Sequence, residues 1–222
     1  MLTTLIASIS FGVTLGQGAT LHCPVMGSAV NKPAEAIAYN GVLYGTCCGG
    51  CGSQFTKDPG KFLKSDKIKG KAVGVFMFDP VAGAKVDTTK SKFGPVTHNG
   101  TQFYFLEEKN MATFKADPKK YAAMPEKEAL FCPVMGHEIK GGYAGAGGYA
   151  DVEGVRYYVC CGGCLGQMKA DGKKFVAKAA KAVKAPTAVM LEDASVFFAQ
   201  EGKAKKEECK NCEAGECSCG GH

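Results

Sequence analysis

Cys23-Pro24-Val25-Met26-Gly27, followed downstream by Cys47-Cys48-Gly49-Gly50-Cys51, is the pattern that decides the fold of this chain, because both motifs occur twice. They return in the same order as residues 132–136 and 160–164. An isolated free cysteine often serves only as a small, buried apolar residue. Matched sets of thiols on either side of a strand-like stretch are instead typical of sites that bind soft metal ions. The sequence therefore predicts two equivalent metal sites.

A third copy of the pattern lies between these two and lacks the thiols. Asp79-Pro80-Val81-Ala82-Gly83 occupies the place of the Cys-Pro-Val-Met-Gly motif, and Leu106 and Asn110 fall at the thiol positions. Internal repeats of this length indicate a chain built from similar units. We predict three units, which are residues 20–70, residues 71–127 and residues 128–186.

Each unit has the sequence pattern of two strands followed by a helix. Asn40-Gly41, Asn99-Gly100 and Glu153-Gly154 are predicted hairpin turns, and Asn-Gly is favoured there because both residues tolerate positive φ. Aromatic and β-branched residues, which are typical of strands, follow each turn. We therefore predict an α+β fold of tandem, small ββα modules. Because the chain has no tryptophan and much glycine, we expect modest cores.

The C-terminal part of the chain is predicted to be helical and then disordered. An Ala/Lys-rich stretch, residues 170–184, predicts a helix that Pro186 ends. Residues 187–202 form a second candidate helix. Residues 203–222 have too few apolar residues to fold alone, although closely spaced thiols there could wrap a soft metal. This tail contains four candidate ligands, Cys209, Cys212, Cys217 and Cys219.

In each of the two complete cysteine sets, two thiols lie where the second strand gives way to the helix. There they face the positive end of the helix dipole and its unpaired N–H groups, which favour the thiolate form. The opening motif brings in a third thiol from across the hairpin, and the vicinal cysteine is a candidate fourth ligand. In this order the ligands are Cys47, Cys51, Cys23 and Cys48 in the first unit and Cys160, Cys164, Cys132 and Cys161 in the third.

These thiol sets suit copper(I) or zinc. A structural zinc site takes four ligands, for which four thiolates are suitable. Copper(I) prefers soft ligands and is satisfied by two or three thiolates, with or without a thioether. Met26 and Met135 could supply a thioether, although packing in the core is the more common role of methionine. His22 and His137 do not occupy equivalent positions, so we expect neither to be an essential ligand.

Two other uses of the thiols remain open. In an exported protein, Cys23 could form a disulfide with Cys47 or Cys51, and the chain would then be a thiol–disulfide redox protein. The thiols could also belong to a structural zinc module that binds a protein partner.

The thiol-free middle unit favours a functional role for the cysteines elsewhere, since the same fold is expected to form there without metal. Asp79 together with Glu107 or Glu108 could bind a harder cation, but exposed carboxylates without an ion are far more common.

Residues 1–19 resemble the uncharged, apolar core of a signal peptide that ends near Gln17-Gly18-Ala19, although the usual basic residues are missing. We expect export to the periplasm or another extracytoplasmic space. The alternative is a buried N-terminal strand in a cytoplasmic protein. This segment is too short to span a bilayer, and no other stretch could do so.

Charge and side-chain chemistry exclude several other functions. The net charge of +6 comes almost entirely from lysine, and Arg156 is the only arginine. Proteins that read nucleic-acid bases depend on arginine, so we expect no nucleic-acid partner. No nucleophile–base pair or carboxylate pair stands out, so we expect no enzymatic activity. The expected partners are metal ions and a metal transporter or metal-receiving protein.

Cys-Pro-Val-x-Gly, an aromatic strand that ends in cysteine, a further cysteine and a helix with Phe55 and Asp58-Pro59 together resemble the YHS domain and its cysteine-rich relative, the TRASH domain. The resemblance covers all three units and is most specific in the first and third. It implies small, treble-clef-like modules that sense or carry heavy metals, often in copper-handling systems. The vicinal Cys48 and Cys161 depart from the family pattern, and the tail lies outside it. We therefore expect a protein for storage, delivery or detoxification of copper(I), zinc or another soft ion.

Overall fold

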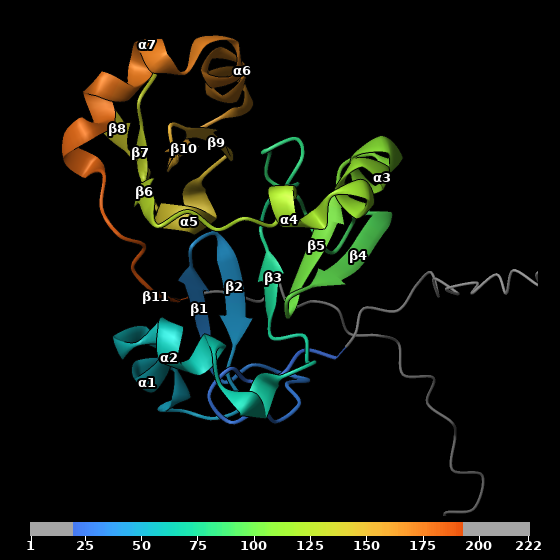
Figure 1. Ribbon diagram of the computed structural model, residues 1–222. Coiled ribbons are helices and arrows are strands. Elements are labelled where there is room, and N and C mark those ends of the chain that lie inside the picture. Colours follow the sequence, from blue (N-terminus) through green and yellow to red (C-terminus); the bar gives the residue numbers. More distant parts are fainter. Residues whose placement is uncertain (1–19, 193–222) are drawn as a thin grey trace, which may run out of the picture.

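The computed structural model describes residues 20–192, which form an α+β structure of short strands and short helices. The predicted fold class is therefore confirmed. We keep the predicted ranges as names, so that residues 20–70, 71–127 and 128–186 are the first, middle and third units. In Figure 1 they run from blue and teal through green to yellow and orange. The predicted signal peptide and cysteine-rich tail lie outside the described residues.

In the first and middle units a β-hairpin is followed by two consecutive short helices. The first unit contains β1 (Ala36–Tyr39), β2 (Val42–Gly45), α1 (Cys51–Lys57), α2 (Pro59–Leu63) and the 3-10 helix η1 (Asp66–Ile68). The middle unit contains β3 (Gly74–Phe76), β4 (Phe93–His98), β5 (Thr101–Phe105), α3 (Glu108–Ala116) and α4 (Pro118–Tyr121). Asn40 and Gly41 have φ angles of 52° and 75°, as the hairpin turn dipeptide predicts.

The third unit has the same hairpin-and-helix order with additional short elements. They are β6 (Lys127–Ala129), β7 (Phe131–Cys132), β8 (His137–Glu138), α5 (Gly142–Gly145), β9 (Gly148–Val152), β10 (Val155–Val159), α6 (Gly162–Asp171), α7 (Lys173–Val176) and the 3-10 helix η2 (Ala177–Ala182). The predicted helix over residues 170–184 is confirmed in part, since this stretch is helical as far as Ala182 but is divided into the end of α6, α7 and a 3-10 helix. The division between α6 and α7 falls at Gly172, where the backbone packs closely on Val152 and an added Cβ would lie 2.7 Å from that side chain.

The segment that follows the third unit forms a strand, β11 (Val189–Leu191). The predicted helix over residues 187–202 is thus wrong for these residues, and residues 193–202 lie outside the described part. β11 is a strand because it completes a sheet, with Met190 opposite Ile37 of β1. The pairing is antiparallel, and this edge position gives the strand hydrogen-bond partners that its local sequence does not indicate.

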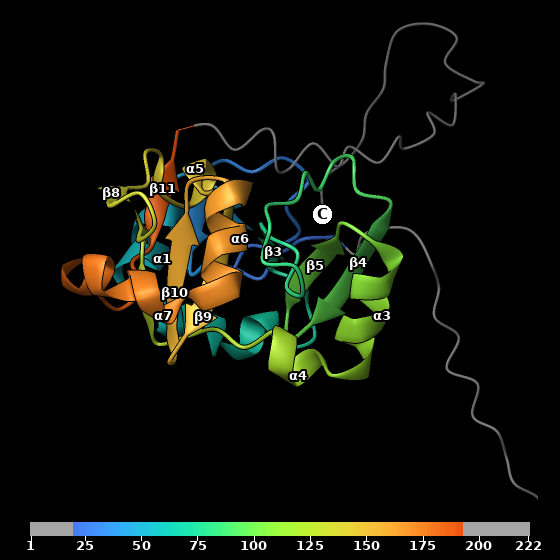
Figure 2. The ribbon, with the colours of Figure 1, turned by 90° about the horizontal axis from the view of Figure 1, so that it is seen from above.

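The hairpins of the first and middle units belong to one sheet. Its strand order is β11-β1-β2-β3-β5-β4, and β3 pairs in parallel with β5 and antiparallel with β2. The third unit has its own three-stranded sheet, β6-β10-β9, and a two-stranded ribbon, β7-β8. Figure 2 shows α6 on one side of the molecule and α3 on the other, with β3 between them.

The buried aromatic side chains link the units into one core. The Phe76 ring of β3 lies 5.5 Å from the Phe103 ring of β5 and 5.7 Å from the Tyr149 ring of β9. Buried residues of all three units belong to the same cluster. This differs from the expected set of modest, separate cores, because each module is too small to cover its own aromatic face and buries it against the next module.

Candidate metal centres

Each unit opens with a tight turn that a glycine closes. In the first unit the N–H of Gly27 donates to the carbonyl of Cys23 at 2.7 Å, and Gly27 has a φ of 71°. Only glycine fits there, because a Cβ would lie 2.5 Å from the carbonyl oxygen of Lys67. The same N–H to C=O bond joins Gly83 to Asp79 and Gly136 to Cys132. We call residues 23–27, 79–83 and 132–136 the opening turns.

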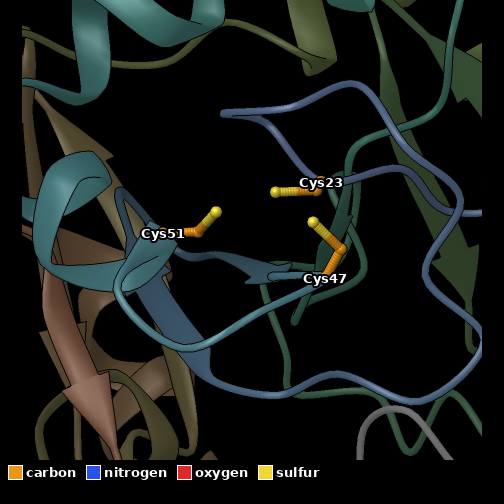
Figure 3. Close-up of side chains that lie close together, drawn as sticks. All are labelled: Cys23, Cys47 and Cys51. Carbon is orange, nitrogen blue, oxygen red and sulfur yellow. The ribbon is translucent and has the colours of Figure 1, made fainter.

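The opening turn of the first unit brings Cys23 to the other two predicted ligands of that unit. Cys47 follows β2, Cys51 is the first residue of α1, and Figure 3 shows the three sulfurs pointing toward one another. All three Sγ atoms lie within 4.8 Å of one another. Cys23 and Cys51 are buried, and Cys47 is half-buried. We call these residues the first triad.

The third unit repeats this arrangement. Cys132, Cys160 and Cys164 have their Sγ atoms within 4.8 Å of one another, and we call them the second triad. Cys160 Sγ lies 3.7 Å from both Cys132 Sγ and Cys164 Sγ. Sulfurs bound at about 2.3 Å to one ion stand about 3.8–4.0 Å apart, so this spacing suits a shared ion. All eight cysteines within residues 20–192 are free thiols, and the candidate disulfide of Cys23 is not formed.

The vicinal cysteines lie beside the triads and are exposed. Cys48 Sγ is 3.0 Å from Cys51 Sγ and 4.0 Å from Cys47 Sγ. Cys161 Sγ is 3.5 Å from Cys164 Sγ. In the first and third units, the sulfurs that could hold one metal ion are nevertheless those of the triad, which come from the opening turn, the end of the strand and the helix. The candidate ligands of the tail lie outside the described residues.

In the first and third units, the cysteine of the opening turn has a lowered pKa. Burial disfavours the Cys23 thiolate, but the backbone N–H groups of Met26, Cys47 and Val25 donate to the sulfur and outweigh burial, so the pKa is lowered. Burial acts against the Cys132 thiolate as well, and N–H donors again lower the pKa overall. The buried end of each triad is therefore where negative charge is best stabilised.

The thiols near the helix starts behave differently from the prediction. Burial raises the pKa of Cys51, and the adjacent Cys48 thiol raises it further. Burial is also the main reason that the pKa values of Cys47, Cys160 and Cys164 are raised. The expected preference for thiolate at these positions is wrong for the metal-free protein, because desolvation outweighs the helix dipole.

A carboxylate that the sequence did not single out occupies the start of α1. Glu35 accepts hydrogen bonds from the N–H of Gly52 at 2.7 Å and from the Thr46 hydroxyl at 3.3 Å. It therefore accepts from a backbone N–H of the first turn of α1. A single glutamate before a strand carries no sequence signal for this role. In the third unit the Cys161 sulfur lies at the start of α6, where the Cys164 N–H lowers its pKa.

The methionines of the opening turns are not core residues. Met26 is 52% exposed and Met135 is 61% exposed, so the expected role in core packing is wrong. Turn geometry explains this, since the residue before the closing glycine projects outward while its N–H faces the thiol. His22 and His137 belong to neither triad and bond backbone carbonyls of Ala72 and Glu138 instead.

The middle unit replaces its triad by hydrogen bonds to one carboxylate. Asp79 is fully buried and accepts from the Leu106 N–H at 2.9 Å and from the Asn110 side-chain amide at 2.7 Å. The N–H groups of Val81 and Ala82 also donate to it, each at 2.9 Å. The expectation that Asp79 is an exposed carboxylate is therefore wrong. Glu107 and Glu108 are exposed, and Glu107 pairs with Lys109.

Comparisons with known proteins found no relative of this chain. No family model matches it, and searches of curated proteins and of solved structures gave no match either. The resemblance to YHS and TRASH domains therefore stays a prediction. Among residues 20–192, no helix is both long enough and apolar enough to cross a membrane.

Proposed function

We propose that this protein binds soft metal ions at its two triads and serves in their storage, delivery or detoxification rather than in catalysis. The observation that carries the proposal is the pair of matching thiol triads, each with sulfurs within 4.8 Å of one another. Three thiols without histidine or carboxylate form a donor set for a soft ion. The units would be copies of one treble-clef-like ββα module of the YHS/TRASH type.

Copper(I) fits this donor set best. It is satisfied by three thiolates, whereas a structural zinc ion requires a fourth ligand. Zinc is the second candidate, favoured by Cys48, whose sulfur is 3.0 Å from that of Cys51. Exposed thioethers at Met26 and Met135 would give a soft ion a further ligand near each site. The four tail cysteines would add capacity, and the proposed location is extracytoplasmic.

The middle unit supports a role as a carrier over one as a structural zinc module. Its Asp79 network holds the opening turn, strand and helix together through hydrogen bonds alone. By analogy, the first and third units would stay folded when they release metal. A structural zinc module would instead unfold when a chelator removes the ion. A thiol–disulfide protein would show stable disulfides that exclude metal, which thiol counting under native and denaturing conditions would reveal.

Metal counting by inductively coupled plasma mass spectrometry tests the proposal. The parent is the full-length chain with Cys209, Cys212, Cys217 and Cys219 changed to serine, loaded with copper(I) or zinc without oxygen. We expect two ions per chain, one after Cys47→Ser with Cys51→Ser or after Cys160→Ser with Cys164→Ser, and none after all four substitutions. Ser53→Ala, on the exposed face of α1, is the matched control and should keep both ions. A parent that binds no metal would refute the proposal.

A further inference from the structure

The thiols of the first unit form a path from the surface to the interior. Cys48 is exposed, Cys47 is half-buried, and Cys23 and Cys51 are buried. Cys48 Sγ touches Cys51 Sγ at 3.0 Å and lies 4.0 Å from Cys47 Sγ. Cys48, Cys47 and Cys51 thus form an outer set of three sulfurs, and Cys23, Cys47 and Cys51 form the inner set. The two sets share two sulfurs, so an ion can pass between them by exchanging one ligand.

The third unit has the same series of thiols from exposed to buried. Cys161 is exposed and its sulfur is 3.5 Å from that of Cys164, while Cys132 is fully buried. The middle unit, which has no triad, also has no exposed vicinal thiol, since Glu107 occupies that position. The two units that have a buried triad therefore also have an exposed vicinal thiol, and the middle unit has neither.

Glycines beside each exposed thiol leave open space at their own positions. A Cβ added to Gly49, Gly50 or Gly162 would find no atom within 4 Å. A glycine pair there leaves room for a second thiol-bearing molecule to approach the vicinal cysteine. Only Gly50 needs glycine for its backbone, with a φ of 89°, so open space is a second use of these positions.

We propose, resting on the metal-binding function above, that Cys48 and Cys161 are transfer ligands and not ligands of the loaded sites. Each would take copper(I) from a thiol donor and pass it to the triad. Cys48 loses its proton and binds the ion while one donor thiolate leaves and is protonated. Cys47 and Cys51 replace the remaining donor ligands in the same way. Cys23 then loses its proton and binds as Cys48 leaves and takes up a proton, and copper remains monovalent throughout.

Rates and affinities measured on one site separate transfer from binding. The parent is the full-length chain with the four tail cysteines and Cys160, Cys161 and Cys164 changed to serine, so that the first unit alone keeps a set of close thiols. Copper(I) is supplied as its glutathione complex, and bicinchoninate is the competing chromogenic chelator. Cys48→Ser should keep the parent's equilibrium affinity and slow uptake about tenfold, because a thiol held beside the site acts at high effective concentration. Cys51→Ser should abolish tight binding.

Two control variants show whether loss of the Cys48 thiol is the cause of the slower copper(I) uptake. Gln54→Ala changes an exposed side chain of α1 that carries no thiol and should leave the rate unchanged. Cys48→Met restores a soft ligand and should recover part of the rate. Cys161→Ser, tested in a chain with Cys47, Cys48 and Cys51 changed to serine instead, repeats the measurement on the second triad.

Two outcomes would overturn the proposal. If Cys48→Ser weakens equilibrium binding as strongly as Cys51→Ser, Cys48 is a fourth ligand. If uptake by Cys48→Ser is as fast as by the parent, the exposed thiol has no part in transfer. A parent that binds no copper(I) would instead refute the metal-binding function itself. Failure of the transfer proposal can therefore be distinguished from failure of the proposed function.

Discussion

The carboxylate of Asp79 lies 2.7 Å from the side-chain amide of Asn110, at two positions where the flanking units have cysteines. A buried acid and an amide thus join the same three segments that a metal ion would join in the first and third units. Four neighbouring N–H groups donate to this buried carboxylate, and these hydrogen bonds offset the cost of removing it from water.

Removing this carboxylate should destabilise the protein strongly. Asp79→Ala leaves four N–H donors without their acceptor, and the one on Asn110 is buried, so we expect the free energy of unfolding to fall by about 3–5 kcal/mol. Urea denaturation of metal-free protein measures this. Asp171→Ala, at an exposed site at the end of α6, is the control and should change stability by less than about 0.5 kcal/mol. Equal effects of the two substitutions would contradict a structural role for Asp79.

The positional match also predicts that a third metal site can be made. Asp79→Cys, Leu106→Cys and Asn110→Cys together place thiols at the three positions that form the triads elsewhere. We expect the triple variant to bind one more copper(I) ion per chain than its parent, as counted by mass spectrometry. Asp79→Cys alone provides one ligand and should add none. An unchanged metal count in a folded triple variant would show that the three positions are not geometrically equivalent.

Metal binding should weaken steeply as the pH falls. The raised pKa values of Cys47 and Cys51 keep these thiols protonated in the metal-free protein at neutral pH, and an ion must displace both protons. Binding should therefore release at least two protons per triad, and affinity should fall by at least about a hundredfold per pH unit between pH 8 and pH 6. Competition with a chelator of known pH dependence measures this. An affinity that does not change over this range would mean that the thiols are already ionised.

The only arginine of the chain should matter for stability and not for metal. Arg156 is buried, makes two bonds of 2.8 Å to Asp151, and lies 4.0 Å from the centre of the Tyr149 ring. Arg156→Lys cannot reproduce this planar, two-pronged contact, so we expect a loss of about 3 kcal/mol in urea denaturation with an unchanged metal count. Lys173→Ala, which breaks only an exposed pair with Glu153, should cost less than about 1 kcal/mol.

Local features of this fold could be predicted from the sequence, and features that depend on distant segments could not. The turn at Asn40-Gly41 and the opening turn closed by Gly27 follow from backbone preferences of a few residues. The parallel pairing of β3 with β5 and the pairing of β11 with β1 join segments far apart in the chain. No local pattern encodes such pairings, so β11 was predicted to be helical.

The same distinction holds for the metal centres. The equal spacing of Cys47 and Cys51 with Cys160 and Cys164 was enough to predict which sulfurs would meet. The ionisation preferences could not be predicted, because they depend on how deeply each sulfur is buried and on which thiols and backbone N–H groups surround it. A motif gives the ligands of a site, whereas its electrostatics comes from the packing around it.

The pairing of β11 with β1 means that the first unit is completed by a segment the ribosome makes after the whole third unit. Until residues 189–191 emerge, one edge of the sheet behind the first triad has no neighbouring strand. Gly52 of α1 lies close to Met190, so β11 also lies beside the helix that carries Cys51. Two segments that are translated far apart in time, β1 and β11, are thus assembled at the same place.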